Sequence, residues 1–558
     1  MTLLDPQTRA TLESEVGQLF PRLTPEQIAR VASRGVPRSI RPGELLVAAG
    51  QQADSFFVLT AGAVEIVGVA AGVEEILVVL SAGQFTGEFS MLAGRRALVN
   101  LRASEPGEVI AVKRDDFLHL VQTDTDIGDV VLQSFLLRRT RLVAQAVGDV
   151  VLVGSDDDSE TLRIKEFLAR NGHPHAALSL DRDPSARALL EQFHVAAREV
   201  PVVLCRGAVL RNPSNAELAD CLGLNESIDP RRVRDLAIIG AGPAGLAAAV
   251  YGASEGLDVL TIEAEAPGGQ AGASSKIENY LGFPTGISGQ ELATRALAQA
   301  ERFGAEQIVA RSACRLSCDR RPYRIDLGGG ESISARAVVI ATGARYRRLN
   351  LPNLSRYEGA GVYYGATPIE EQLCRGEEVA VVGGGNSAGQ AAVYLSRGAA
   401  RVHILVRSAG LDESMSRYLI RRIEANPAIV LHTRTEIVAL EGESRLERVT
   451  WRDNATATAT THSMRHVFSM TGAVPSTAWL EGCVALDEDG FVKTGSDLSA
   501  EDLAAARWPL TRPPHLFETT RPGVFAVGDV RCGSLKRVAS AVGEGSIAIS
   551  FVHQTLRE

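Results

Sequence analysis

The chain has 558 residues, which is too many for one hydrophobic core and predicts three or four domains. Its 45% hydrophobic and 22% charged residues are ordinary for a soluble globular protein, and a net charge of −9 without any Lys/Arg run argues against nucleic-acid binding. The start of the chain lacks the pattern of a signal peptide, and no stretch approaches about 18 uninterrupted apolar residues, so we expect a cytoplasmic protein without a membrane span.

The first 147 residues change from a helical to a strand-rich pattern and back. Residues 25–35 have helical spacing, whereas "GELLVAAGQQADSFFVLTAGAVEIVGV" breaks into short strands with Gly and Asp at the turns, which is typical of a small β-roll. Residues 124–147 return to a helix whose acidic start and basic later part suit the helix dipole.

Two further patterns follow. From residue 148 the order strand, helix, strand, helix, strand, strand predicts a compact α/β unit, which ends with "EVPVVLCRGAVLRN". From residue 235 to the end, apolar strands alternate with helices, which predicts parallel sheets covered by helices.

The strongest nucleotide signal is "RDLAIIGAGPAGLAAAVYGASEGLDVLTIEAEAPGGQ". A strand runs into Gly240-x-Gly242-x-x-Gly245, a helix follows, and a second strand ends at Glu263. The first Gly permits a tight turn, the second lets the backbone approach a pyrophosphate, and the third lets helix and strand pack closely. The helix N-terminus favours phosphate, and Glu263 can accept hydrogen bonds from an adenosine ribose.

A second copy, "EEVAVVGGGNSAGQAAVYLSRGAARVHILVRS", contains Gly383-x-Gly385-x-x-Ala388. Its second strand ends in Arg407 rather than an acid, and a guanidinium pairs with a ribose 2′-phosphate, so this site favours NADPH over NADH. The expected site also contains Asn386, Ser387 and Arg417, of which Arg417 is either a second phosphate contact or a solvated helix residue.

A third signal lies near the C-terminus, where a strand delivers Gly528-Asp529 ahead of a helix. Together with "VVIATGARYRRL", "GGQ", "IENYLGF" and "GAVPST", these motifs resemble the flavoprotein pyridine nucleotide–disulfide reductases, most closely the low-molecular-weight thioredoxin reductases. The resemblance covers residues 235–558 and implies bound FAD, an inserted NADPH domain and a homodimer. The further FAD-site residues that it implies are Pro243, Ala244, Gly269, Gln270, Asn279, Thr342, Gly343, Lys536, Arg537 and Val538. The segment 497–520 is longer than this family expects.

The redox dithiol of that family is missing. In the octet "VYYGATPI" (362–369), the family's Cys-Ala-Thr-Cys is replaced by Gly365-Ala366-Thr367-Pro368. A disulfide step needs a thiolate and a partner sulfur, so the family's dithiol reaction cannot run here, and we assign no catalytic residue. Cys374 and Cys532 lie near the nucleotide motifs, and we expect both to be inert.

The seven cysteines do not predict a disulfide framework. The close pair is Cys314 and Cys318, which lie on one face of an expected strand with Cα atoms about 13 Å apart, beyond the limit of about 7 Å for a bridge. We therefore expect two strand cysteines. The histidines of "HPH" (173–175) lack accompanying ligands, and no metal site is expected.

The first unit resembles a cyclic nucleotide-binding domain. Gly87-Glu88 matches the position where Glu88 would accept from the ribose hydroxyl, but the family's phosphate-binding Arg is replaced by Ala97, with Arg95 and Arg96 just before it. Losing that charge-assisted contact weakens binding about 10–100-fold. Cyclic nucleotide binding and a β-roll retained for interdomain contact both remain open.

The second unit resembles a thioredoxin or glutaredoxin fold, because of its topology and because Pro201 in "EVPVV" matches the family's cis-proline turn. Its expected dithiol loop, "SDDDSET", has no cysteine, so we expect a docking or spacer domain.

The predicted fold class is multidomain: an N-terminal β-roll, an α/β thioredoxin-like domain, then two Rossmann-like α/β FAD and NADP domains. The expected boundaries are 1–147 for the cyclic nucleotide-binding-like domain, 148–228 for the thioredoxin-like domain, 229–352 and 477–558 for the FAD domain, and 353–476 for the NADP domain.

The preferred function is an NADPH-dependent FAD oxidoreductase whose flavin passes electrons directly to an external acceptor, which could be a small redox protein, a quinone or oxygen. One alternative is a flavin or nucleotide redox sensor whose N-terminal domains transmit its state to a partner. A further alternative is a thioredoxin-disulfide reductase that uses a non-family cysteine such as Cys532.

Overall fold

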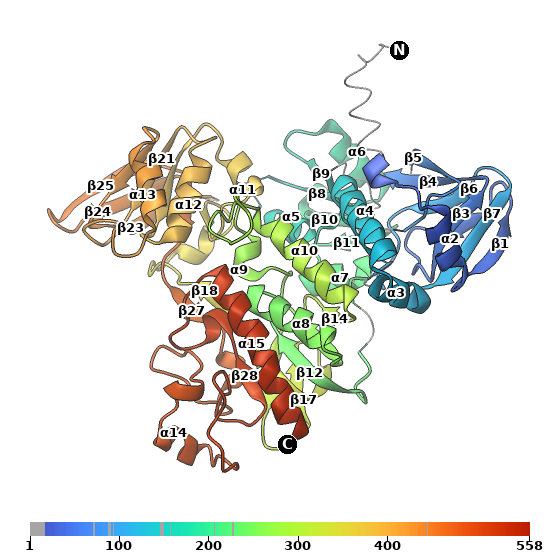
Figure 1. The fold of residues 1–558 in the computed structure, drawn as a ribbon. Helices are drawn as coiled ribbons and strands as arrows, with labels where there is room; N and C mark the ends of the chain where they lie inside the picture. The colour runs from blue at the N-terminus through green and yellow to red at the C-terminus, as the bar shows by residue number, and fades with distance from the viewer. Residues whose placement is uncertain are drawn as a thin grey trace. The chain divides into compact units, whose positions relative to one another are not determined.

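The computed structural model describes residues 17–70, 73–87, 91–92, 94–144, 150–156, 158–205, 207–225, 228–443 and 445–558 (Figure 1). Their contacts divide the chain into two compact units. Unit 1 comprises Met1–Gly154, Asn171–Ile228 and Leu297–Ala310, and unit 2 comprises Ser155–Arg170, Asp229–Ala296 and Arg311–Glu558.

The β-roll of unit 1 consists of two antiparallel sheets, ordered β1-β7-β3 and β2-β6-β4-β5. Its strands are β1 (Val36–Ile40), β2 (Leu45–Val47), β3 (Ser55–Ala61), β4 (Ala63–Ala70), β5 (Val73–Ser81), β6 (Asn100–Ala103) and β7 (Gly107–Lys113). Helices α2 (Pro25–Ala32), α3 (Arg114–Thr123) and α4 (Thr125–Ala144) flank them. Phe56 stacks on Phe117 at 4.5 Å between ring centroids, which packs α3 against β3. The expected β-roll and its following helix are thus confirmed.

The third sheet of unit 1 has the order β11-β10-β8-β9. Its strands are β8 (Val150–Gly154), β9 (Ala176–Ser179), β10 (Val202–Cys205) and β11 (Ala208–Arg211), with helices α6 (Pro184–Gln192) and α7 (Asn215–Leu222). Only the β8–β9 pair is parallel, which is the arrangement expected of a thioredoxin-like domain. The Val200–Pro201 peptide bond is cis.

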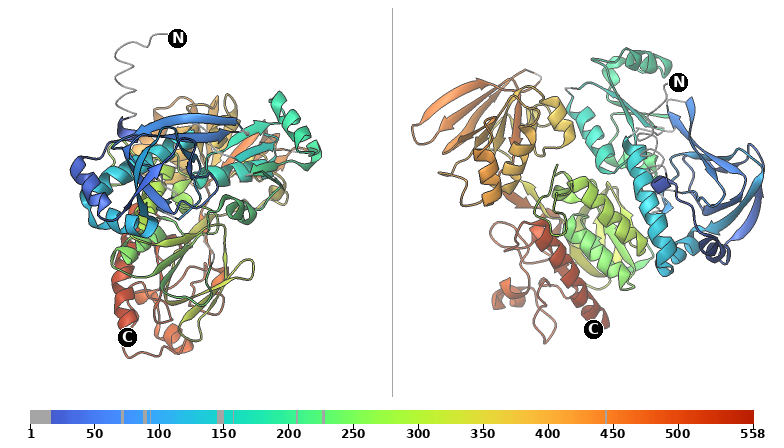
Figure 2. Two further views of the ribbon diagram at one scale, coloured as in Figure 1. Left: turned by 90° about the vertical axis from the view of Figure 1, so that its right-hand side faces the viewer. Right: turned by 45° about the horizontal axis from the view of Figure 1, so that its top comes forward.

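The first sheet of unit 2 contains the strands β13-β12-β17-β16-β15 in this order, with β28 paired to β17. The strands are β12 (Val233–Ile239), β13 (Val259–Ile262), β15 (Ala313–Ser317), β16 (Tyr323–Leu327), β17 (Ser332–Ile340) and β28 (Val524–Ala526). Helices α8 (Pro243–Ser254) and α15 (Val538–Arg557) lie side by side (Figures 1 and 2). A Cβ on Gly545 would lie 2.2 Å from the Ala244 carbonyl oxygen, so a glycine permits this close helix packing.

The second sheet of unit 2 is parallel throughout and ordered β19-β26-β20-β21-β22. Its strands are β19 (Val362–Tyr363), β20 (Glu378–Val382), β21 (Arg401–Leu405), β22 (Ile429–His432) and β26 (His466–Ser469), with helices α11 (Pro368–Leu373), α12 (Asn386–Leu395) and α13 (Arg417–Glu424). A meander of β23 (Thr435–Glu441), β24 (Arg448–Asp453) and β25 (Thr458–Ser463) is also present. Two chain segments connect the two sheets of unit 2. Within them, β18 (Ala344–Tyr346) and β27 (Ala473–Pro475) form an antiparallel pair.

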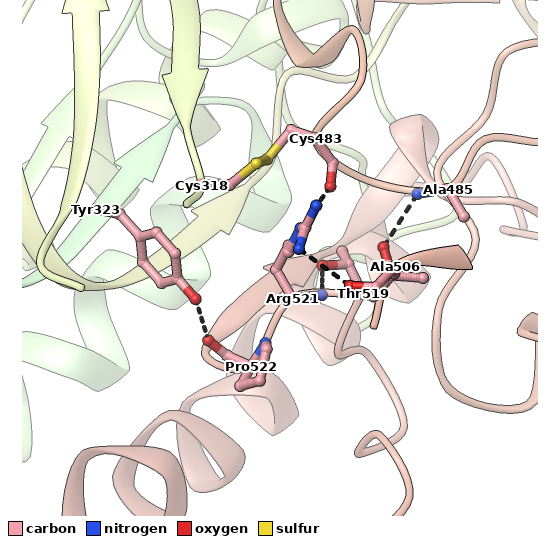
Figure 3. Close-up of a disulfide and its surroundings, with 9 residues drawn as sticks. Cys318, Tyr323, Cys483, Ala485, Ala506, Thr519, Arg521 and Pro522 are labelled. Carbon is pink, nitrogen blue, oxygen red and sulfur yellow. Dashed lines mark hydrogen bonds between the residues drawn. A yellow bond between two sulfur atoms is a disulfide. The ribbon is translucent and has the colours of Figure 1, made fainter. Parts of the chain in front are cut away.

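Four cysteines form disulfides, so the expectation that Cys318 is an unpaired strand cysteine is wrong. Cys318 lies just after β15 and bonds Cys483, which is 165 residues away in the chain (Figure 3). Strand geometry correctly excluded Cys314 as its partner but says nothing about distant segments. Cys205 at the end of β10 bonds Cys221 in α7.

The long segment 497–520 folds onto the C-terminal part of unit 2. It contains α14 (Ala500–Ala505), which Ser499 caps by accepting from the Asp502 N–H at 3.1 Å. Arg512 pairs at 2.6 Å with the fully buried carboxylate of Glu518 and at 2.6 Å with Glu558. Arg521 donates to the carbonyls of Cys483 and Ala506 (Figure 3).

Across the described ranges, no helix is long and apolar enough to cross a membrane. The same residues contain no group of three or more side chains suited to hold a metal ion.

Candidate functional site

The first glycine motif shows why each of its glycines is needed. Gly240 has φ +106°, and a Cβ there would lie 2.3 Å from the Ala341 carbonyl oxygen. A Cβ on Gly245 would lie 1.9 Å from the Gly240 oxygen. At Gly242, in contrast, the nearest atom to an added Cβ is the Gly269 Cα, 3.9 Å away. The turn is therefore crowded at its first and third glycines and open at the second, which suits the close approach of a pyrophosphate.

Glu263 lies immediately after β13, beside this turn. Its carboxylate accepts from the Ala241 N–H at 2.7 Å and from the Glu265 N–H at 2.9 Å, which fixes its position. Burial raises the pKa of Glu263, and the two backbone donors oppose that rise. Each carboxylate oxygen has a second lone pair, so the group can still accept from a ribose hydroxyl.

The second glycine motif repeats the same pattern. Gly383 has φ +142°, and a Cβ there would lie 2.4 Å from the Met470 oxygen, whereas an added Cβ on Gly385 would meet nothing within 4 Å. The Ala388 methyl would lie 3.3 Å from a Cβ on Gly383, so an alanine still fits the packing position. The open second glycine is again the place where backbone can meet phosphate.

Two arginines border this second site. Arg407 is exposed and lies two residues after β21, one position beyond the place that corresponds to Glu263 after β13. Arg417 begins α13, is exposed, and lies 3.6 Å from Asp412. Asn386 accepts from the Ser416 N–H at 2.7 Å, which ties the motif to the start of α13. Arg407 and Arg417 thus offer positive charge that suits a ribose 2′-phosphate.

Tyr346 lies between the two motifs and was not singled out from the sequence. Ser387 and Asp529 both lie close enough to influence the pKa of its hydroxyl. Burial raises the pKa of Tyr346 and that of Asp529, and Lys536 opposes the shift at Asp529. The structure therefore brings Asp529 and Ser387 to one region through a tyrosine in the connecting strand β18, a contact that local sequence patterns do not encode.

The C-terminal motif is held by α15. Gly528 has φ +73°, and its N–H donates to Glu544 at 2.7 Å, while Glu544 also pairs with Arg531 at 2.8 Å. Lys536 is exposed, with its ammonium 4.5 Å from the Phe491 ring centroid. Arg537 is the N-cap of α15 and Val538 is its first residue. Helix α15 therefore starts close in sequence to Asp529.

The remaining expected FAD residues lie in loops and in one short helix. Thr342 donates to the Ser476 carbonyl at 2.8 Å, and the following Gly343 has φ +63°. Gly269 and Gln270 form the start of the short helix α9 (Gly269–Gly272). Asn279 lines a cavity of about 470 Å³, together with Lys276, Glu278, Pro284, Thr285, Tyr418 and Arg422. This cavity is within the size range of small-molecule sites.

The position of the missing dithiol lies beside this region. Ala366 forms a β-bridge with Ser274, and a Cβ on Gly365 would lie 3.9 Å from the Ala273 methyl. Thr367 caps α11, with Pro368 as the first helical residue. The expected dithiol segment is thus a helix cap without sulfur.

Two of the three free cysteines, Cys374 and Cys532, are poorly suited to replace it. Burial raises the pKa of Cys374 to about 12, and burial together with Asp487 raises that of Cys532. A thiol with a raised pKa is a poor nucleophile because little thiolate is present near neutral pH.

The Cys318–Cys483 disulfide lies at the far end of the sheet. Across the sheet, Ser317 pairs with Arg324 and Arg324 pairs with Ser334 on β17. Farther along β17, Ile340 pairs with Ile239, which lies next to the glycine turn. Ser334 and Ile340 are six residues apart. Six residues along a strand span roughly 20 Å, which separates this disulfide from the nucleotide end.

The β-roll has a pocket of about 40 Å³, lined largely by apolar side chains such as Ile66, Met91, Ala97 and Val99. Ordinary ligand pockets measure about 300–1,000 Å³. Arg95 is 9% exposed and pairs with the 5% exposed Glu301 at 3.2 Å, so its guanidinium is committed to a carboxylate. Glu88, the expected ribose contact, lies outside the described residues.

Two family models match the chain. Residues 234–545 match the pyridine nucleotide-disulphide oxidoreductase model, and residues 37–124 match the cyclic nucleotide-binding domain model. The chain is 33% identical to the thioredoxin reductase of Bacillus subtilis over 327 residues. This matched region covers 59% of this chain and 96% of the relative.

Solved structures agree. A thioredoxin reductase from Lactococcus lactis in the FR conformation is similar with a TM-score of 0.52 and 27% identity, covering 58% of this chain and 99% of that one. A thioredoxin reductase from T. acidophilum is similar with a TM-score of 0.51, 27% identity and the same coverage. Such relatives use FAD and NADPH. Each of the two glycine turns is open at its second glycine, which suits the pyrophosphate of FAD at one turn and of NADPH at the other. The chain therefore belongs to the pyridine nucleotide-disulphide oxidoreductase family, as an NADPH-dependent flavoprotein oxidoreductase similar to thioredoxin reductase and joined to an N-terminal cyclic nucleotide-binding domain.

Proposed function

We propose that this chain delivers electrons from NADPH to an external acceptor through FAD, without a redox dithiol of its own. The observation that supports this is the helix cap Gly365-Ala366-Thr367-Pro368 where the family has two cysteines. The acceptor is a small redox protein, a quinone or oxygen.

When bound, FAD and NADPH supply the hydride and electron chemistry, and the protein contributes binding and orientation. In this proposal Gly242 and Gly385 admit the two pyrophosphates, Glu263 binds the FAD ribose, and Arg407 binds the 2′-phosphate. Asp529 and the start of α15 hold the rest of FAD. The experiment that tests the proposal is anaerobic mixing of the purified protein with NADPH while flavin absorbance is followed. Flavin that stays oxidised would contradict it.

Removing all free thiols is expected to leave acceptor reduction intact. In the variant C314S/C374V/C532S, the rate of NADPH-dependent acceptor reduction should change by less than about twofold, because no transition-state interaction is lost. The measurement is steady-state turnover with a quinone, after thermal unfolding has shown that the variant folds. A variant whose flavin is still bleached by NADPH but which no longer reduces the acceptor would establish a thiol relay, and C532S alone would then test the disulfide-reductase alternative.

The second candidate function is a redox or nucleotide sensor. The observation that favours it is the buried Arg95–Glu301 pair, which joins the β-roll to the end of helix α10 (Gly289–Arg302). Turnover near zero with every acceptor, combined with ligand-dependent binding of a partner, would favour this candidate over the first.

Cyclic nucleotides are expected to bind weakly. The small apolar pocket and the Ala97 substitution support a loss of about 10–100-fold relative to a site with its phosphate-binding Arg. Calorimetry with cyclic AMP and cyclic GMP measures this directly, and the unrelated nucleotide AMP serves as control. Submicromolar binding of either cyclic nucleotide would contradict the expectation.

We further propose a cytoplasmic homodimer with domains at 1–147, 148–228, 229–352 plus 477–558, and 353–476. The resemblance to thioredoxin reductases supports the dimer, and sedimentation of the purified protein tests it.

A further inference from the structure

Helix α5 (Ser159–Arg170) follows β8 of the third sheet of unit 1, yet its contacts place it in unit 2. Near its start, Leu162 is 8% exposed and belongs to the apolar cluster that contains Val381 of β20. At its end, the Arg170 carbonyl accepts from the side chain of Gln290, in the first turn of α10, at 2.9 Å. The helix is therefore held near both ends by residues of unit 2.

The guanidinium of Arg170 joins two points of one segment, residues 263–269, here called the acid loop. One terminal nitrogen pairs with the Glu265 carboxylate at 3.1 Å, and the other donates to the Gly269 carbonyl at 3.2 Å. A planar guanidinium presents its donors in a fixed fork, so it can hold both acceptors at once. Arg170 therefore limits how far the acid loop can move.

The acid loop borders the first glycine turn at both of its ends. The Glu263 carboxylate accepts from the Ala241 N–H at 2.7 Å, and the Gly268 N–H donates to the Ala241 carbonyl at 2.8 Å. Gly269 follows so closely that a Cβ on it would lie 3.0 Å from the Gly242 Cα. The acid loop thus carries the carboxylate expected to bind the ribose and packs on the glycine expected to face the pyrophosphate.

The charge of Arg170 acts in the same direction as these contacts. Burial raises the pKa of Glu263, and the backbone donors and the Arg170 charge oppose that rise, whereas the Glu265 charge adds to it. An ionised carboxylate is a stronger acceptor for a hydroxyl than a neutral one. The Arg170 side chain is 22% exposed, so water screens its charge only in part. Arg170 therefore favours the form of Glu263 that binds a ribose hydroxyl.

From these contacts we infer that Arg170 is a positioning residue of the FAD site. It holds the acid loop against the first glycine turn, so that the carboxylate and the open glycine are in place before FAD binds, and such preorganisation increases affinity. Arg170 lies outside residues 234–545, which match the reductase model, so the segment in front of that region contributes to cofactor binding. The inference rests on the proposed function, which assigns FAD to the first turn.

The test compares the FAD affinity of full-length apoproteins by fluorescence titration. R170M removes the guanidinium donors and keeps an unbranched apolar side chain. Its FAD dissociation constant should rise by about tenfold or more, because a hydrogen bond from a charged group contributes about ten- to hundredfold in affinity. R170K keeps the charge without the fork and should give a value between those of R170M and the native protein.

Two further variants show which contact is responsible. R163M is the matched control, because Arg163 stands on the same helix and pairs with Glu160 of that helix at 2.9 Å, and it should keep native FAD affinity. E265Q should weaken FAD binding by less than about fivefold, because an ion pair with an exposed carboxylate contributes little. The melting temperature of apo-R170M and its NADP⁺ affinity, measured by calorimetry, should both remain native, whereas a merely structural arginine would lower both.

Native FAD affinity in R170M, together with FAD loss in Gly242→Ala, would overturn this inference and leave the proposed function in place. Equal FAD losses in R170M and R163M would also overturn it, as would a lowered melting temperature of apo-R170M together with weakened NADP⁺ binding. If R170M did not fold, R170Q would be judged by the same criterion. Native FAD affinity in Gly242→Ala would overturn the assignment of FAD to the first turn and this inference with it.

Discussion

Gly242→Ala is expected to give a folded protein that has lost FAD. The glycine has φ −70° and ψ −177°, which any residue adopts, and the nearest atom to the added methyl is 3.9 Å away, so the fold without cofactor should accept the change. The methyl projects into the open space where the backbone is expected to meet the pyrophosphate. Because each 1.4 kcal/mol is tenfold in affinity, even one lost charge-assisted contact should reduce FAD binding by about tenfold or more.

The measurement is the flavin-to-protein absorbance ratio after purification, followed by titration with FAD. Gly385→Ala is the matched control, since it has φ −90° and nothing within 4 Å of an added Cβ. It should keep full FAD occupancy yet show slow flavin reduction by NADPH. If both variants lost FAD equally, or if Gly242→Ala retained it at native affinity, the assignment of the first turn to FAD would be wrong.

The glycine motifs and the sheets could be predicted because their signals are local. The spacing of Gly240, Gly242 and Gly245 specifies a turn and a helix start within six residues, and apolar strands alternating with helices specify a parallel sheet. The thioredoxin-like strand order followed from the same kind of pattern. Each signal lies within a few turns of chain, where backbone geometry depends mostly on neighbouring residues.

The contacts that could not be predicted join distant segments. Cys318 bonds Cys483 because the fold brings β15 and the 478–483 turn together. The residues beside each cysteine contain no pattern that predicts this pairing. The sequence places Arg95 near the lost phosphate-binding position but does not show which way its side chain points, and in the structure it pairs with Glu301.

The structure strengthens the conclusion that the family's dithiol has no substitute in this chain. A lost cysteine pair alone could be compensated by another thiol nearby. However, the free thiols Cys374 and Cys532 have raised pKa values, and the Cys318–Cys483 disulfide lies at the opposite end of the sheet from the nucleotide motifs. The position of the dithiol is a helix cap without sulfur, and its buried Ala366 packs in an apolar cluster.

Arg407→Ala is expected to weaken NADPH use by about 10–100-fold, because a hydrogen-bonded charged contact contributes about 1.5–3 kcal/mol. Arg407 is exposed, so its removal should leave the melting temperature unchanged. NADH has no 2′-phosphate, and its kcat/KM should therefore change little. Steady-state kinetics with both nucleotides at two ionic strengths measures this, since salt screens the phosphate contact.

Arg417→Ala serves as the comparison for Arg407, because both side chains are exposed arginines of the same region. Arg417 already lies 3.6 Å from the exposed Asp412, and such surface pairs contribute only about 0–1 kcal/mol, so its removal should raise the KM for NADPH by less than about fivefold. A larger effect for Arg417 than for Arg407 would move the 2′-phosphate to the start of α13. Equal losses with NADPH and NADH would show that Arg407 supports the fold of the site, and that the preference for NADPH arises elsewhere.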